Sequence, residues 1–508
     1  MTILEPPRGP VAIARQLGPG LILAASIVGS GELIATTKVG AEAGFLLLWL
    51  IVLGCVIKVF TQVELGRATV TEGKTALESL DGLPGPRPRV GWAVWLWLAM
   101  TVLALAQQGG IVGGVGQALA IAQPLTERGI EDNRLLDELV GLQVEQGIAR
   151  AQIDGAAASA GTAEMAARIS ELEDTLASRP GAPDALLWSA LLAVATSVLL
   201  LVGRYRLIQT VATALVGLFT LTTVATVLLL QRESGWAITS DEVASGLSFQ
   251  LPKPVEGVSR APLATALAAF GIIGVGSAEL IMYPYWCLEK GYARWTGPRE
   301  DSAAWRERAR GWMRVLRWDA WVSALVYTFA TVAFYLLGAA VLGRAGLNPS
   351  GDRLIRTLAE MYQPVFGDWA PGVFLVGSFC VLYSTFFVTG AGFARLCADG
   401  VRVFRLGADT PDSYARWVRI FSGLYPLVCL GVYAYVRAPA QLVLASGVAQ
   451  SLMLPVLGFA ALWLRYRRID PALRPSRLWD AMLWLSFAGF LVAGAWTLAS
   501  RLFPSIAG

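Results

Sequence analysis

Apolar residues gather along this chain into long runs that short polar segments separate. Eleven of these runs come close to the ~20 residues that a helix needs to cross the hydrocarbon core of a bilayer. They cover residues 17–40, 44–65, 92–121, 185–203, 207–230, 262–288, 319–343, 369–397, 417–436, 440–463 and 479–500. The pattern predicts an all-α polytopic membrane protein with about 11 transmembrane helices.

The composition agrees with a bilayer environment and narrows the chemistry. Of the 508 residues, 55% are hydrophobic and 15% are charged, whereas soluble proteins carry about 25% charged residues. The chain has no histidine, which excludes imidazole as a metal ligand or proton carrier. Its five cysteines lack paired spacing, which disfavours disulfides and a cysteine zinc site. We find no nucleophile–base set or phosphate-binding loop, and we expect neither an enzyme, nor a bound cofactor, nor a nucleic-acid partner.

Basic residues concentrate in every second loop. Four loops are rich in arginine and lysine, namely 67–89, 290–317, 402–416 and 465–474. Cytoplasmic loops carry an excess of such residues, and these four fall on the same side of the membrane if the N-terminus is cytoplasmic. We therefore predict a multi-pass protein of the cell (inner or plasma) membrane, with residues 1–16 in the cytoplasm and the C-terminus outside.

One loop on the opposite side is unusually long. Residues 122–184 hold twelve acidic and five basic residues, and two helix-like stretches flank the segment GAAASAG. We predict an external acidic helical hairpin between spans 3 and 4. It is either a solvated appendage or oligomer contact, or a device that concentrates cations by its negative charge. The sequence leaves the oligomeric state open.

A short motif occurs twice, in opposite halves of the chain. Residues 28–34 read VGSGELI and residues 275–281 read VGSAELI, in the first and sixth spans. Five spans separate the two copies, so the second copy crosses the membrane in the opposite direction. This arrangement is typical of inverted-repeat transporters, whose halves meet around a substrate site. We predict repeats of five spans each, at 17–230 and 262–463, followed by an eleventh span at 479–500.

Small residues in the motif favour a break in each helix. Glycines such as Gly29 and Gly276 weaken a helix by about 1 kcal/mol each relative to alanine. Unwinding a short stretch there therefore costs little free energy. Unwound backbone carbonyls, with the hydroxyls of Ser30 and Ser277, are potential cation ligands. Alternatively, the small residues only permit close packing of helices.

Each copy of the motif places a glutamate near the middle of its span. A carboxylate at that depth costs several kcal/mol, which makes Glu32 and Glu279 functional candidates. If the two spans cross, both carboxylates could share one divalent cation, or one proton. The alternative is a structural use, in which each carboxylate accepts hydrogen bonds from a broken helix end.

These residues resemble a known family. The stretch LGPGLILAASIVGSGELIATTKVGAEAGFLLLWLIVL looks like the first two spans of the Nramp metal-ion transporters, and LVLASGVAQSLMLPV looks like their tenth. The resemblance extends in order over nearly all spans and leaves out the insertion at 122–184. It implies a LeuT-type inverted repeat (5+5) of eleven helices, with helices 1 and 6 broken in mid-membrane at the site.

The chain departs from the family at its metal-binding motifs. Where the family has DPGN in helix 1, this chain has residues 29–32, so the metal-binding aspartate is missing and Glu32 replaces the asparagine. Where the family has Met-Pro-His in helix 6, this chain has Ala278, Glu279 and Leu280. Loss of methionine and gain of carboxylate favour hard cations, which prefer oxygen ligands.

Two further positions are implied by the resemblance. The acids that relay protons in the third helix correspond to Gln107 and Gly110, so the family's proton coupling is not expected. The glutamine that can join the site from helix 10 falls near Gly447, one turn from Gln450.

We therefore expect a secondary transporter of a divalent metal cation, a hard ion such as Mg²⁺ or Mn²⁺, that works by alternating access. The metal ligands would include Glu32 and Glu279. The alternative is a transporter of a small organic solute, an amine or amino acid, in which the glutamates bind a coupling cation or the substrate. Tyr283, Tyr285 and Trp286 would then be candidates for an aromatic wall. A third hypothesis is a non-transporting sensor or scaffold that presents the external hairpin.

Overall fold

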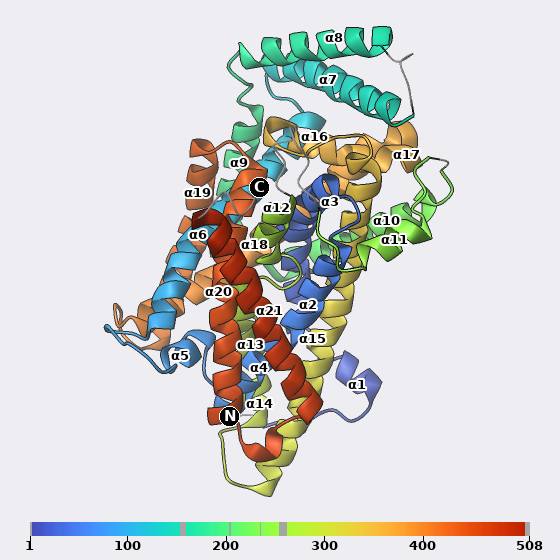
Figure 1. Cartoon of the computed structure of the whole chain (residues 1–508). Helices are drawn as coiled ribbons and strands as arrows, with labels where there is room; N and C mark the ends of the chain where they lie inside the picture. The colour runs from blue at the N-terminus through green and yellow to red at the C-terminus, as the bar shows by residue number, and fades with distance from the viewer. Residues whose placement is uncertain (1–2, 153–158, 203–204, 234, 253–261, 503–508) are drawn as a thin grey trace.

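The computed structural model describes residues 3–152, 159–202, 205–233, 235–252 and 262–502, and all regular elements among them are helices. The helices stand side by side in one bundle, with α7 (Glu127–Gln152) and α8 (Ser159–Ala177) lying across its upper end (Figure 1). In the described part of the chain, eight helices are long and apolar enough to cross a membrane, and a bent helix pair adds a ninth crossing. The predicted all-helical membrane fold is therefore confirmed.

The first half of the bundle contains the helices that correspond to spans 1 to 5. They are α2 (Pro19–Ile27), η1 (Val28–Thr36) and α3 (Thr37–Ala43) in span 1, then α4 (Leu48–Glu72), α6 (Trp92–Ala122), α9 (Asp184–Val202) and α10 (Tyr205–Leu230). The second half holds α12 (Pro262–Phe270) and α13 (Ser277–Lys290) in span 6, then α15 (Ala303–Leu337) with η3 (Gly338–Gly343), α18 (Ala370–Val403), α19 (Pro411–Tyr435), α20 (Pro439–Arg467) and α21 (Arg477–Leu502).

Shorter helices connect the crossings. They are α1 (Pro10–Ala14), α5 (Ala76–Asp81), α11 (Ser240–Gly246), α14 (Tyr292–Thr296), η4 (Gly351–Arg353), α16 (Leu354–Ala359), η5 (Glu360–Tyr362), α17 (Gln363–Phe366), η6 (Gly367–Trp369) and η7 (Pro471–Leu473). The α15 helix begins well inside the basic loop predicted at 290–317, because the Ser302 hydroxyl accepts the amide of Trp305 and caps it. The helix therefore extends beyond the apolar run that predicted span 7.

Spans 1 and 6 are both broken, as predicted, but in different ways. In span 1 the pieces Pro19–Ile27 and Gly31–Ala43 are bent by 41° at the beginning of η1, which is a π-helix with wide turns rather than an unwound segment. In span 6, α12 ends at Phe270 and α13 begins at Ser277, and the residues between them leave helical geometry. Gly274 there has a left-handed φ of +61°, which a residue with a side chain rarely adopts. We call residues 271–276 the span 6 break.

The two broken spans touch at their interrupted segments. A methyl group built on Gly31 would lie 2.7 Å from the carbonyl oxygen of Ile272 in the span 6 break. Glycine at this position therefore lets the π-helix of span 1 approach the backbone of span 6. This close approach accounts for the glycine at position 31 of the first motif.

The insertion between α6 and α9 contains two helices that contact each other, α7 (Glu127–Gln152) and α8 (Ser159–Ala177), at the upper end of the bundle (Figure 1). It is docked on the segment between η3 and α18. Arg353 pairs with Glu173 at 3.0 Å, and the buried Arg356 pairs with Asp137. A methyl group on Gly147 would collide with the carbonyl of Ala345. Within the described residues, the insertion therefore packs on the bundle.

Candidate functional site

The carboxylate of Glu32, in span 1, accepts hydrogen bonds from both span 6 and span 7. Its side chain lies in η1 and has no exposed surface. The Oε1 atom accepts the backbone N–H of Gly274 at 3.0 Å and the hydroxyl of Thr331, in α15, at 3.0 Å. The Oε2 atom has no hydrogen-bond partner. Because an unpaired buried carboxylate oxygen is costly, Oε2 is a candidate ligand for a cation.

Glu279 provides a second buried carboxylate. It lies in the first turn of α13, where the positive end of the helix dipole stabilises negative charge, and it is 4% exposed. Its Oε2 atom also lacks a hydrogen-bond partner. Each broken span thus contributes one buried carboxylate with an unpartnered oxygen.

The Gln450 side chain links α20 to the start of α13 and to α6. Its Oε1 atom accepts the N–H of Ala278 at 3.1 Å, and its Nε2 atom donates to Oε1 of Gln107 at 2.6 Å. The hydroxyl of Ser277 donates to the Gln450 carbonyl oxygen at 2.7 Å. The structure therefore brings Gln107, Ser277 and Gln450 together in one buried polar network.

Gly276 lies between this network and Glu279. A methyl group built on it would lie 2.3 Å from Oε2 of Glu279 and 2.8 Å from Oε1 of Gln450. These two oxygens therefore flank the glycine. Gly29 packs elsewhere, since a methyl group there would lie 2.3 Å from the hydroxyl oxygen of Thr385 in α18, which supports the packing alternative. The Ser30 side chain lies outside the described parts of the structure.

Lys58 is a further charged residue of the site, and the sequence reasoning did not single it out. It lies near the middle of α4 with no exposed surface. Its Nζ atom donates to the carbonyl oxygens of Phe270 and, at 2.6 Å, of Ile273, at the end of α12. The sequence does contain a signal for Lys58, because it is a lysine inside the apolar run 44–65. A charged residue within a membrane span is a functional candidate.

The donor set around the two breaks consists mainly of oxygens. No group of three histidine, cysteine, aspartate or glutamate side chains that could hold a metal occurs in the part of the chain that the structure describes. The Cys55 thiol lies against Gly274, but it completes no such cluster with the two glutamates. A cation would thus combine carboxylates with amide, hydroxyl or backbone oxygens, or water. Such a set fits Mg²⁺, Ca²⁺ or Mn²⁺ better than soft metals.

The aromatic residues that follow Glu279 are engaged elsewhere. The Tyr283 hydroxyl donates to Asp319 at 3.0 Å and the Tyr285 hydroxyl donates to Asp399 at 2.6 Å. The ring of Trp286 lies under the guanidinium of Arg395. These contacts give the three side chains structural roles and weaken the hypothesis of an aromatic wall.

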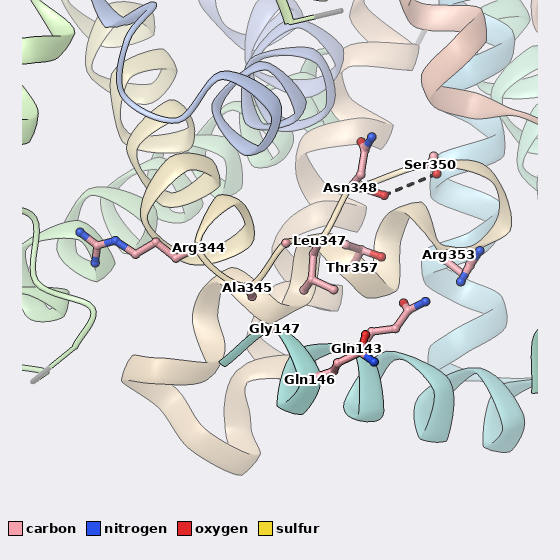
Figure 2. Close-up of a pocket in the computed structure, with 11 residues that line it drawn as sticks. Gln143, Gln146, Gly147, Arg344, Ala345, Leu347, Asn348, Ser350, Arg353 and Thr357 are labelled. Atoms are coloured by element: carbon pink, nitrogen blue, oxygen red, sulfur yellow. Dashed lines mark hydrogen bonds between the residues drawn. The ribbon is translucent and has the colours of Figure 1, made fainter. Parts of the chain in front are cut away.

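A cavity of about 580 Å³ lies apart from the carboxylates, between α7 and the segment that follows η3 (Figure 2). Its lining is polar and includes Gln143, Arg344, Asn348, Arg353 and Thr357. Both arginines already pair with acids, Arg344 with Glu242 and Arg353 with Glu173. The charges of this cavity are therefore compensated by the protein itself.

Comparison with known proteins places the chain in a family. A model of the natural resistance-associated macrophage protein-like (Nramp) family matches residues 156–500. An uncharacterized protein of Pasteurella multocida (strain Pm70) is 21% identical over 490 residues, which cover 95% of this chain and 90% of that protein.

Solved structures agree in fold. A mutant of the Eremococcus coleocola manganese transporter superposes with a TM-score of 0.57 at 15% identity, covering 99% of this chain and 91% of that one. MhsT in complex with L-phenylalanine superposes with a TM-score of 0.53 at 16% identity, covering 93% and 97%. The LeuT-type architecture is therefore confirmed. Because the family model matches more than half of the sequence, this chain belongs to the Nramp-like family of membrane transporters.

Proposed function

We propose that this protein is a secondary transporter of a divalent metal cation, a hard ion such as Mg²⁺ or Mn²⁺, that works by alternating access. The cation is bound between the two broken spans by Glu32 and Glu279. Membership of the Nramp-like family and the fold shared with a manganese transporter support this proposal. We further propose that the protein resides in the cell membrane with its N-terminus in the cytoplasm.

The observation that carries the proposal is the pair of carboxylates in the interior. Both are buried, each belongs to a different broken span, and each has an oxygen without a hydrogen-bond partner. Two such groups are unfavourable in a membrane interior unless a cation or a proton compensates them. Because alternating access moves one half of the bundle against the other, a cation held by both spans is bound where the halves meet.

Proton coupling through the family's usual route is not part of the proposal. The relay position in α6 is occupied by Gln107, a neutral side chain that is bonded to Gln450. A side-chain amide does not ionise near neutral pH, so it cannot take up and release a coupling proton as a carboxylate does. We therefore propose that the divalent cation moves down its own gradient.

Flux of Mg²⁺ and Mn²⁺ into proteoliposomes tests this function. Native protein should give saturable flux, and Glu32→Gln and Glu279→Gln should each reduce it at least tenfold, since each removes a charged ligand. Glu72→Gln is the matched control, because Glu72 also has a buried unpartnered oxygen but lies at the C-terminal end of α4. Equal loss of flux in all three variants, or normal flux in both site variants, would contradict the proposal.

Transport of a small organic amine or amino acid is a second candidate, and one observation favours it. The Lys58 ammonium and the Glu32 carboxylate contact the same peptide group, and with Glu279 also ionised the three groups sum to a single negative charge, which one amine would neutralise. Flux assays with small amines and amino acids, in the absence of divalent ions, distinguish the two functions. Uptake of a solute without any divalent requirement would favour this candidate.

A further inference from the structure

One peptide group of the span 6 break is held by opposite charges at its two ends. The carbonyl oxygen of Ile273 accepts from the Lys58 ammonium at 2.6 Å, and the adjoining N–H of Gly274 donates to the Glu32 carboxylate at 3.0 Å. Both charged side chains are fully buried. Since these carbonyl oxygen and nitrogen atoms are bonded to the same carbon, the ammonium and the carboxylate lie within about 8 Å of each other.

The carbonyls that Lys58 contacts are those that a broken helix leaves without partners. Phe270 is the last residue of α12, and Ile273 lies three residues beyond it. Carbonyl groups at a helix C-terminus have no intrahelical donor and carry the negative end of the helix dipole. In broken transporter helices, such carbonyls coordinate Na⁺ or another coupling ion. Here the cation is a side chain of the protein.

The packing of α4 fixes the ammonium at this position. A methyl group on Gly54 would lie 3.0 Å from the ring of Phe270, and one on Gly274 would lie 3.2 Å from the Cys55 sulfur. The Lys58 Nζ atom also stands 4.9 Å from the centre of the Phe270 ring. One face of α4 therefore closes over the span 6 break and holds the charge against it.

We propose that Lys58 is a tethered cation that occupies the place of an exchangeable coupling ion at the span 6 break. The charged or ionisable groups that act on it are Cys55 on its own helix, Glu32 from η1 and Glu279 from α13. The ammonium keeps the outer half of span 6 in place during transport. The substrate cation then binds at the glutamates, and transport requires neither Na⁺ nor K⁺.

This inference concerns the coupling of the proposed transporter, but part of its test is independent of transport. Lys58→Ala removes the ammonium and leaves a space beside two carbonyl oxygens. The thermal stability of this variant in detergent should rise by several degrees with Na⁺ or methylammonium relative to choline, which is too large for the space. Native protein, Lys58→Arg and the control Lys74→Ala, which changes a half-buried lysine just beyond the end of α4, should show no such difference.

Transport provides the second readout. Divalent flux through Lys58→Ala should fall at least tenfold in choline and recover in part with methylammonium or Na⁺, while Lys58→Arg keeps most of the native flux. A lysine with only a packing role would give no recovery by small cations, and that result overturns the proposal.

If Lys58→Ala does not fold, the dependence of divalent flux on Na⁺ in native protein tests the proposal instead. Divalent flux should be the same within a factor of two when Na⁺ is replaced by choline on both sides of the membrane. Several-fold stimulation by Na⁺ overturns the proposal, because the coupling position would then be open. If native protein moves no divalent cation, the proposed function fails, while the stability assay still decides the role of Lys58.

Discussion

Three charged side chains, Glu32, Glu279 and Lys58, are buried where the two broken spans meet. The glutamates take hydrogen bonds or dipole stabilisation from the span 6 break and α13, and the lysine donates to the carbonyls that end α12. Glu32 and Lys58 thus bind backbone groups that a continuous helix would have paired internally, and Glu279 lies at the N-terminal end of α13. At the residue scale, the breaks and the charges stabilise one another.

Gly276→Ala tests how tightly the site is packed. The new methyl group would lie 2.3 Å from Oε2 of Glu279, so either the carboxylate or the start of α13 must move. We expect divalent flux to fall at least tenfold while the protein still elutes as a folded species. Gly431→Ala in α19, where nothing lies within 4 Å of the added methyl, is the matched control and should retain native flux. Native flux in Gly276→Ala would show that the Glu279 carboxylate does not serve the site.

Glu32 and Glu279 could be named as candidates from the sequence, whereas Lys58 was missed. A repeated motif drew attention to Glu32 and Glu279, because each follows small residues at the same depth of its span. Lys58 belongs to no repeat, and one charge hardly changes the mean hydropathy of a long apolar run. Its contacts also come from residues more than 200 positions away, which only the folded chain brings together.

At the scale of elements, the breaks of spans 1 and 6 have different backbones. Glycines predicted a weakened helix in both, and that much is correct. Helix propensity alone could not distinguish a π-helix from an unwound turn, because the backbone conformation depends on which residues pack against the segment. Span 1 bends by 41° but stays helical through η1, and its Gly31 lies against the carbonyl of Ile272 in span 6, where the backbone leaves helical geometry.

The helical insertion is the other element whose packing the sequence left open. Asp137→Lys would place a positive charge beside Arg356, a buried arginine of α16. We expect amide hydrogen exchange in α7 and α16 to rise several-fold, because local opening becomes easier by about 1 kcal/mol. Glu171→Lys is the control, since Glu171 in α8 is similarly exposed and pairs with Arg168 of the same helix. Unchanged exchange in Asp137→Lys would mean that this ion pair does not hold the insertion on the bundle.

At the scale of the whole molecule, the hydropathy pattern predicted an all-helical membrane bundle, because a membrane allows few alternatives to helices. The LeuT-type arrangement of that bundle was implied by the resemblance to the Nramp family rather than by hydropathy. In Figure 1, α5, α14 and the connection between α20 and α21 lie at the lower end, while α7 and α8 lie at the upper end. This separation is what the charge asymmetry of the loops predicts for two sides of a membrane.

Labelling of single cysteines tests this orientation. In a variant without the native cysteines, Glu164→Cys in α8 should react with a membrane-impermeant maleimide in intact cells. Arg299→Cys, between α14 and α15, should react only after the membrane is opened. Both positions are exposed, so accessibility reports the side of the membrane rather than burial. The opposite labelling pattern would reverse the proposed topology.

Equilibrium binding of Mn²⁺ to the purified protein, followed by the paramagnetic resonance signal of the free ion, tests the central claim most directly. We predict one site in native protein, affinity at least tenfold weaker in Glu32→Gln and in Glu279→Gln, and native affinity in Glu72→Gln. A tenfold loss corresponds to about 1.4 kcal/mol, a modest value for removing a charged ligand. Native affinity in both site variants would contradict a cation site formed by the two broken spans.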